Sequence, residues 1–230
     1  MSNRVSVDRI SFYMDEYLKP TEFLDCSNPT VREFAATHSI GAKSDTEKAV
    51  KLYYAVRDGF QYDPNVLDLR REGLTASRLL KRTRGYCVEK AILLAASARA
   101  VGIPSRLSFY IVRNHIATDR LEKVLEKDYL VFHGAAEMLL EGEWRKATPA
   151  FNKKLCDFLG VEPLEFDGTG DSIFQEFDKS GNIFMEYLHD YGAFDDLPYD
   201  MYLDELNKHY PHIFGNENYT KQELIYDFRR

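Results

Sequence analysis

The chain has 230 residues, of which 44% are apolar and 29% are charged, and its formal net charge at pH 7 is -7. This length and composition are enough for one well-buried core, which excludes an intrinsically disordered chain. The negative charge without a basic stripe excludes nucleic acid as the main partner, and the absence of a long apolar run or a leader-like N-terminus predicts a cytoplasmic protein with no membrane partner.

Helical signals dominate the first part of the chain, residues 1–43, which we expect to be an N-terminal helical segment. Asp8–Lys19 carries apolar residues at helical spacing, and Asn28-Pro29 is typical of an N-cap followed by proline in the first turn. Ser44–Glu47 is a capping box, and the helix that it opens should end at Gly59.

The next segment predicts a short extended piece and two helices. Phe60–Pro64 is ended by proline, and Thr75–Leu80 has the spacing of a short helix. After a glycine turn, Cys87 stands in the first turn of an Ala-rich apolar helix. We expect that helix to stop at Gly102, since Pro104 prevents its simple continuation.

The hydrophobic period then changes to that of a sheet. Arg106–Val112, Asp128–Leu140 and Glu143–Thr148 are rich in β-branched, aromatic and aliphatic residues, and Glu141-Gly142 predicts a hairpin between the last two. Asn114–Lys127 is a charged insertion with helical spacing, which we expect to border a cleft between helix and sheet.

Beyond the strands, residues 153–230 predict a helical extension packed on the core rather than a separately folding domain. We therefore expect one domain, 1–230, with its core at 44–152. The aromatic residues between Phe174 and Tyr199 indicate packing, and some of them should wall the cleft. The expected short helices are Leu155–Leu159, Ile173–Phe177, Ile183–Leu188 and Tyr199–Leu206.

Cys87 is the candidate nucleophile. The unpaired N–H groups at a helix start stabilise a thiolate and also offer donors to an oxyanion. Cys26 and Cys156 are expected to be small core residues, because three widely spaced cysteines fit neither a disulfide framework nor a zinc site. We expect no metal and no cofactor.

His133 is the candidate base. It is the only histidine inside a run that predicts a buried strand, whereas the other five lie in polar, turn-rich or strand-end positions. A cysteine held on a helix and a histidine delivered by a sheet are the two parts that nucleophilic catalysis needs.

Three spaced motifs resemble the core of the transglutaminase-like superfamily. They are Leu74-Thr-Ala-Ser-Arg-Leu-Leu, Arg84-Gly-Tyr-Cys-Val-Glu-Lys-Ala and Ala100-Val-Gly-Ile-Pro-Ser-Arg. The resemblance covers about residues 46–152 and implies an α+β, papain-like fold in which the cysteine helix packs on an antiparallel sheet. It implies Cys87 as nucleophile, His133 as base and acyl transfer from an amide as the chemistry.

One position departs from the family pattern. The family places an acid four residues after a tryptophan, and here that position, counted from Trp144, holds Thr148. A threonine hydroxyl can orient the imidazole but carries no charge to stabilise imidazolium. Asn152 is another possible orienter, and Gln61 a possible second oxyanion donor, although a lone glutamine on a strand more often faces solvent.

The function that this sequence predicts is a cysteine-dependent amide hydrolase or acyl transferase acting on a peptide or a small peptide-derived amide. Water and an amine both remain open as acyl acceptor, and the sequence does not address the oligomeric state. The alternative is a non-catalytic module that keeps the fold and binds a peptide or partner segment, for which Thr148 is the best support.

Overall fold

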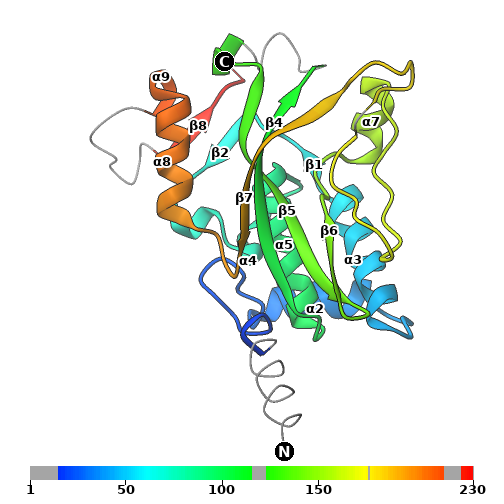
Figure 1. Ribbon diagram of the computed structural model, residues 1–230. Helices are drawn as coiled ribbons and strands as arrows, with labels where there is room; N and C mark the ends of the chain where they lie inside the picture. The colour runs from blue at the N-terminus through cyan, green and yellow to red at the C-terminus, as the bar shows by residue number, and fades with distance from the viewer. Residues whose placement is uncertain (1–14, 116–122, 176, 215–223, 230) are drawn as a thin grey trace, which may run out of the picture.

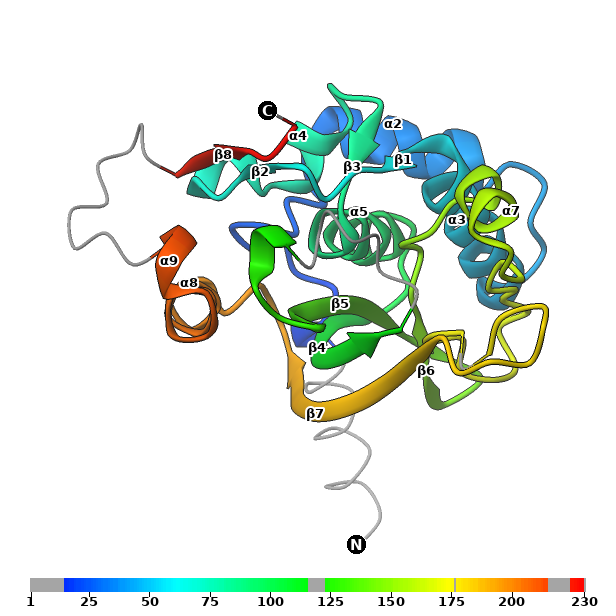
Figure 2. The ribbon, with the colours of Figure 1, turned by 90° about the horizontal axis from the view of Figure 1, so that it is seen from above.

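The fold is built around one helix that is buried on all sides, α5 (Cys87–Ala100) (Figure 1). A computed structural model describes residues 15–115, 123–175, 177–214 and 224–229 of the chain. Each α5 residue from Cys87 to Arg99 is buried, including the polar Glu89, Lys90, Ser97 and Arg99, in a helix whose other residues are apolar and mostly small. Seen nearly along its axis in Figure 2, α5 lies between a sheet and a layer of helices.

The helical layer consists of α2 (Pro29–His38), α3 (Asp45–Gly59) and α4 (Ala76–Leu79), which all pack on α5. The predicted helix starts are confirmed: Asn28 Oδ1 accepts from Thr30 N at 3.0 Å. Ser44 Oγ accepts from Glu47 N at 3.1 Å, and α3 ends at Gly59 as expected.

The sheet is antiparallel, has the strand order β6-β5-β4-β7 and covers the other side of α5. The three strands expected from the sequence are confirmed, with a hairpin whose Glu141 and Gly142 both have positive φ, 51° and 84°. The fold is therefore α+β, as predicted. The bounds are β4 Ser105–Asn114, β5 Tyr129–Leu140, β6 Glu143–Ala147 and β7 Met185–Phe194.

The C-terminal part differs from the expected series of short helices. The helices predicted at Ile173–Phe177 and Ile183–Leu188 are wrong: Phe177 and Ile183 form a β-bridge, and the chain then enters β7, which pairs with β4. Pairing with a strand more than 70 residues away overrides the local helical spacing. The other two helices are confirmed as α7 (Lys153–Leu159) and α8 (Tyr199–His209).

Two small sheets include strands from the segment before Cys87. In the first, β1 (Gln61–Tyr62) runs parallel to β3 (Arg84–Gly85), and in the second, β2 (Val66–Asp68) runs antiparallel to β8 (Ile225–Asp227). The chain between them also forms the short 3-10 helix η1 (Arg71–Gly73), and α9 (Pro211–Phe214) follows α8. The pairing of β2 with β8 places the C-terminal strand beside the chain that precedes α4 (Figure 1).

Some predictions fall outside the described residues. Most of Asp8–Lys19 and residues 116–122 of the expected insertion lie there. The division of the chain at 43 and 152 stays a prediction. Within the described ranges, no helix combines the length and the apolarity that crossing a bilayer needs.

Candidate active site around Cys87

Cys87 is the first residue of α5, and a glycine two positions earlier makes that placement possible. A Cβ on Gly85 would lie 2.8 Å from Leu79 Cδ1 and 3.3 Å from Glu89 Oε2. Glu89 in turn accepts a hydrogen bond from Tyr86 N at 3.2 Å, which satisfies one of the open donors at the helix start. The Gly-x-Cys spacing therefore reflects a steric requirement as well as a turn.

The Cys87 thiol is only 7% exposed, and its burial decides its acidity. Backbone N–H groups of Gly134, Val88 and Cys87 itself point to the sulfur and favour the thiolate. Desolvation outweighs them and raises the pKa of Cys87 to about 11. In this state the helix-start donors do not outweigh burial, so the thiol is protonated at pH 7, and activation of the thiolate stays a prediction.

Strand β5 approaches α5 closely at Gly134. A Cβ at this position would lie 3.1 Å from Val88 Cα and 3.4 Å from Ala91 Cβ, so any larger residue would push strand and helix apart. This close approach is what lets the Gly134 N–H reach the sulfur of Cys87. Because His133 directly precedes Gly134, the same contact holds the histidine backbone next to the nucleophile.

A β-bulge lies immediately before the histidine. On β4, Tyr110 pairs with His133 and Val112 pairs with Leu130, so β5 carries one extra residue between the two pairs. Phe132 takes up the irregularity with φ 57°, a left-handed conformation that is uncommon for a bulky residue. Bulges near active sites redirect the side chains that follow them.

The His133 ring is buried, with 2% of the residue exposed. Burial lowers its pKa to about 4, so the imidazole is neutral at pH 7, which is the form that a general base requires. Its Nδ1 has no hydrogen-bond partner among the described residues. The ring therefore has unused hydrogen-bonding capacity in this structure.

The two expected orienters do not bond to this ring. Thr148 Oγ1 is buried and, within the described parts of the chain, also has no partner, so the hydrogen bond expected between Thr148 and His133 is not formed. Asn152 Oδ1 accepts from Tyr62 N at 3.0 Å instead, which fixes β1 against the segment after β6. Thr148 and Asn152 are both buried, at 2% and 8% exposed.

Tyr62, rather than Gln61, is the β1 residue at the nucleophile. Gln61 is exposed, and its backbone N–H bonds to Thr83 O at 2.9 Å. Tyr62 lies against Cys87, whose sulfur adds to the effect of burial and raises the pKa of the Tyr62 hydroxyl well above its usual value. Successive strand residues point to opposite faces, so only one of the two could face Cys87, and the structure shows that it is Tyr62.

One turn further along α5, Lys90 is buried completely and tied to three carbonyl groups. Its Nζ donates to Arg57 O at 2.9 Å, Phe60 O at 2.8 Å and Ala150 O at 2.7 Å. Burial lowers the pKa of Lys90 to about 7. The lysine connects the end of α3 to the segment that carries Thr148 and Asn152, and sequence analysis had not assigned it a role.

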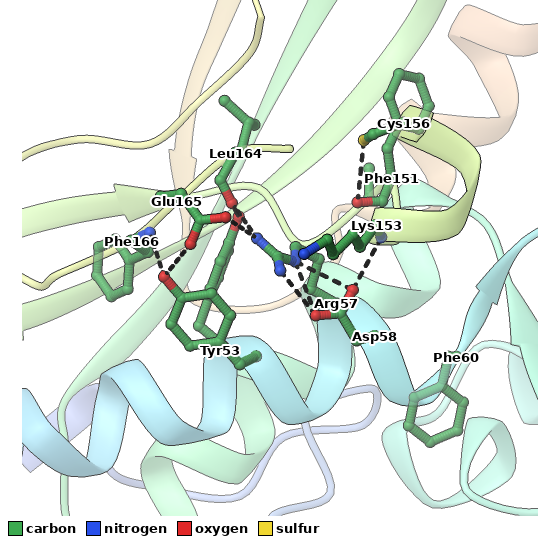
Figure 3. A network of polar contacts seen from close by, with 12 residues as sticks. Tyr53, Arg57, Asp58, Phe60, Phe151, Lys153, Cys156, Leu164, Glu165 and Phe166 are labelled. Atoms are coloured by element: carbon green, nitrogen blue, oxygen red, sulfur yellow. Dashed lines mark hydrogen bonds and ion pairs between the residues drawn. The ribbon is translucent and has the colours of Figure 1, made fainter. Parts of the chain in front are cut away.

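A second polar network connects α3 to the segment that follows β6 (Figure 3). Arg57 donates to Leu164 O at 2.6 Å and pairs with Asp58, whose Oδ1 accepts from Lys153 N at 2.9 Å at the start of α7. Tyr53 OH also donates to Leu164 O, at 2.8 Å. The chain after β6 is thus fixed to α3 at several points before it leaves the site.

A pocket opens at Cys87, with about 530 Å³ of empty space when the solvent at its mouth is included, and we call it the cysteine pocket. Its walls come from the β1–β2 segment, from the start of β5 and from α8 and α9. Cys87 and Tyr62 line it, whereas His133, Thr148, Asn152 and Gln61 do not. The lining residues are Tyr62, Pro64, Leu67, Tyr86, Cys87, Leu125, Leu130, Val131, Phe132, Tyr202, Leu206, Tyr210, Phe214 and Phe228.

The aromatic residues expected to wall the cleft are not those that do so. The ones singled out in the sequence lie between residues 174 and 199, and none of them lines the pocket. The wall comes instead from Tyr202, Tyr210 and Phe214, further along the chain. Cys26 and Cys156 are buried free thiols away from the pocket, as predicted.

Comparison with known proteins gives one family and two solved structures. The family model described as the transglutaminase-like superfamily matches residues 13–149. A "Putative Cysteine Protease from Cytophaga hutchinsonii" is 14% identical, with 77% of this chain and 53% of that chain covered and a TM-score of 0.45. A "putative protease from Parabacteroides distasonis" is 18% identical, with 59% and 25% covered and a TM-score of 0.39.

The chain thus spans about half the length of the first of these structures and a quarter of the second. No curated protein matches it.

Proposed function

The chain belongs to the transglutaminase-like superfamily, and from that premise we propose that it is a cysteine-dependent amide hydrolase or acyl transferase. Its substrate would be a peptide or a peptide-derived amide, and the reaction would pass through a thioester on Cys87. The observation that carries the proposal is the position of the Cys87 sulfur: at the start of α5, in the wall of a pocket, with backbone N–H groups directed at it.

In the proposed reaction, Cys87 attacks the amide carbonyl carbon while His133 takes the thiol proton. A carbon–sulfur bond forms, and the carbonyl oxygen becomes an oxyanion that the N–H groups of Gly134 and Cys87 can stabilise. The intermediate collapses with cleavage of the carbon–nitrogen bond, and the amine leaves with the proton that His133 returns. Water or a second amine then attacks the thioester and regenerates the thiol.

The protonation states of Cys87 and His133 favour transfer of the thiol proton during the attack on the substrate. They do not favour a thiolate–imidazolium pair formed beforehand. The thiol pKa near 11 and the imidazole pKa near 4 both keep the groups neutral at pH 7. In the proposal, the substrate brings His133 to the sulfur through rotation of a ring whose Nδ1 is unbonded. The Tyr62 hydroxyl beside the sulfur would be a hydrogen-bond donor to the thiolate or to the oxyanion.

A cytoplasmic location belongs to the same proposal. The cysteines Cys26, Cys87 and Cys156 are free thiols, which fits a reducing compartment. Fractionation of the native host with detection of the chain in the soluble cytoplasmic fraction tests this point.

Acyl-enzyme trapping tests the proposed reaction directly. The protein is mixed with a panel of N-acyl amino-acid 4-nitrophenyl esters, and the mass of the intact protein and of its peptides is followed. We expect a covalent acyl group on Cys87 in the parent and in Cys26→Ser, and none on that residue in Cys87→Ala. His133→Ala should slow acylation by about 100-fold, the usual size of a general-base contribution.

An unmodified Cys87, or equal acylation of all three cysteines, would contradict the proposal. Adding a primary amine to the acylated protein distinguishes the two acceptors. An acyl transferase should give the amide product faster than the acid, whereas a hydrolase should release mainly the acid.

A non-catalytic binding module is the second candidate, and a specific observation favours it. The Nδ1 atom of His133 and the Oγ1 atom of Thr148 lack partners in the described residues, so no carboxylate or hydroxyl orients the ring. A parent protein that binds a peptide without turnover, and a Cys87→Ser variant that binds it with the same affinity, would support this candidate over the enzyme.

A further inference from the structure

The cysteine pocket is apolar apart from the thiol and four tyrosine hydroxyls. Of the described residues that line it, none carries a formal charge at pH 7. Its walls are aliphatic and aromatic. A group that enters beside Cys87 therefore meets mainly hydrocarbon.

The tyrosine hydroxyls of the pocket are largely used within the protein. Tyr86 and Tyr202 hydrogen-bond to each other at 2.7 Å. Tyr210 donates to Tyr129 O at 2.8 Å and accepts from Val131 N at 3.1 Å. With these groups already bonded, the rings present carbon to the pocket, and they offer little to a polar or charged ligand.

Charged side chains gather in a separate hollow, which we call the charged hollow. It is lined by Asp63, Val66, Arg82, Thr83, Arg84, Gly85, Glu89 and Arg229. Four segments of the chain contribute adjacent residues, one to the cysteine pocket and the next to the charged hollow. The pairs, with the pocket residue first, are Tyr62 and Asp63, Leu67 and Val66, Tyr86 and Gly85, and Phe228 and Arg229.

This alternation separates the apolar cysteine pocket from the charged hollow, with the same backbone segments lying between them. Neighbouring residues of an extended segment point to opposite sides, so the same segments that place aspartate and arginine in the charged hollow keep them out of the cysteine pocket. A charged group in the cysteine pocket would lose its hydration and gain no counter-charge, whereas an apolar group would be removed from water.

We propose that the cysteine pocket binds an uncharged aliphatic or aromatic group that lies next to the amide carbonyl attacked by Cys87. The substrate class is then an amide of an apolar amino acid or of an apolar acyl group, in place of one with a charged side chain. This assignment rests on the proposed function, since it places the substrate by the position of the Cys87 sulfur.

Alkylation by three chloroacetamides tests the assignment without requiring turnover. N-benzyl-2-chloroacetamide carries an apolar group, 2-chloroacetamide carries none, and N-(chloroacetyl)glycine carries a carboxylate. The rate at Cys87 is measured by peptide mass spectrometry and divided by the rate of each reagent with free cysteine. We expect the benzyl reagent to be about tenfold faster than 2-chloroacetamide and the carboxylate reagent about tenfold slower, as differences in pocket fit and desolvation predict.

Two neighbouring variants on β2 provide a matched pair. Leu67 lines the cysteine pocket and Val66 lines the charged hollow, and both are half-buried. Leu67→Arg should abolish the preference for the benzyl reagent and make the carboxylate reagent the faster one, because the guanidinium supplies the missing counter-charge. Val66→Arg should keep the parent's order of rates. Thermal melting of both variants checks that they are folded.

The outcomes separate this inference from the function on which it rests. Equal normalised rates for the three reagents at a reactive Cys87 would overturn the apolar pocket while leaving the cysteine chemistry intact. A Cys87 that reacts with none of them, while the same peptide is alkylated in the denatured protein, would overturn both. A reversed order of rates in Val66→Arg as well would also overturn the assignment, since the effect would not depend on the pocket.

Discussion

Two neighbouring regions along α5, around Lys90 and around Cys87 one helical turn earlier, treat their polar groups in opposite ways. On the Lys90 side, Nζ donates to three carbonyl oxygens, so each of its N–H groups has an acceptor. Around Cys87, the buried Nδ1 of His133, the residue before Gly134, has no partner in the described residues, and the same holds for the buried Oγ1 of Thr148 on the segment after β6. Both sides are equally hidden from solvent, so burial alone does not explain the difference.

The contrast indicates which buried polar groups stabilise the fold and which are available for function. Buried polar groups are normally hydrogen-bonded because a missing partner costs free energy, so a saturated cluster indicates a structural role. Unpartnered buried groups next to a pocket reduce stability and leave hydrogen-bonding capacity for a ligand. The comparison predicts that changes on the Lys90 side affect folding, whereas changes on the Cys87 side affect reactivity and pH response.

Removal of the Lys90 ammonium should have the largest effect. Lys90→Met leaves three buried carbonyl groups without donors, and we expect the free energy of unfolding to fall by ~3 kcal/mol, measured by urea denaturation. Lys51→Met is the control. Lys51 lies on an exposed part of α3 and, among the described residues, donates one hydrogen bond, to Ile40 O. Its substitution should lower the free energy of unfolding by less than ~0.5 kcal/mol. Equal decreases in the free energy of unfolding of both variants would show that the hydrogen bonds of Lys90 to three carbonyl groups do not stabilise the fold more than a surface lysine does.

The second prediction concerns His133 and pH. Its folded-state pKa of about 4 lies below its ordinary value of 6.5, so the unfolded chain takes up the proton first as the solution is acidified. The free energy of unfolding should therefore fall between pH 6.5 and pH 4, with a total contribution of ~3 kcal/mol from this group. Above pH 6.5 its contribution is constant.

Comparison with His133→Gln isolates this effect. Burial raises the pKa of Glu89 to about 7, and that carboxyl contributes with the opposite sign as the pH rises toward 7. Because Glu89 is present in both proteins, its effect cancels in the difference between them. Chemical denaturation at pH 4, 5, 6 and 7 gives this difference, and a difference independent of pH would mean that His133 is not buried as a neutral ring.

The smallest expected effect is a gain in the reactivity of Cys87 when the unpartnered hydroxyl of Thr148 is replaced by a carboxylate. Thr148→Asp should raise the rate of Cys87 alkylation at pH 7 by about tenfold, because a carboxylate near the imidazole stabilises its protonated form. Thr148→Val keeps the shape and removes the unbonded oxygen, so it should leave the alkylation rate unchanged and not lower stability. No gain in the Asp variant would mean that another residue orients His133.

Local signals in the sequence predicted most of the fold. The N-caps at Asn28 and Ser44 and the hairpin at Glu141-Gly142 depend only on a few neighbouring residues, and they are confirmed. The β7 strand was missed because Met185–Phe194 becomes a strand through pairing with β4, which no local period reveals.

The site was predicted less completely, for a related reason. The position of Cys87 at a helix start follows from the sequence, whereas its raised pKa depends on burial by distant segments such as α8. The choice between Gln61 and Tyr62 required the direction of a two-residue strand, and Lys90 could be assigned only once three remote carbonyl groups were seen to meet at its ammonium.

The extra residue that β5 carries at Phe132 has a consequence for how this protein can tolerate insertions and deletions. Deletion of one residue between Leu130 and His133 would remove the extra residue, so the pairs Tyr110–His133 and Val112–Leu130 would stand in a regular ladder and the local bend would be lost. Leu130, Val131 and Phe132 now line the pocket one after another, whereas neighbouring residues of a regular strand point to opposite faces, so part of this wall would turn away from the pocket. We therefore expect this stretch to accept many substitutions but no change in length.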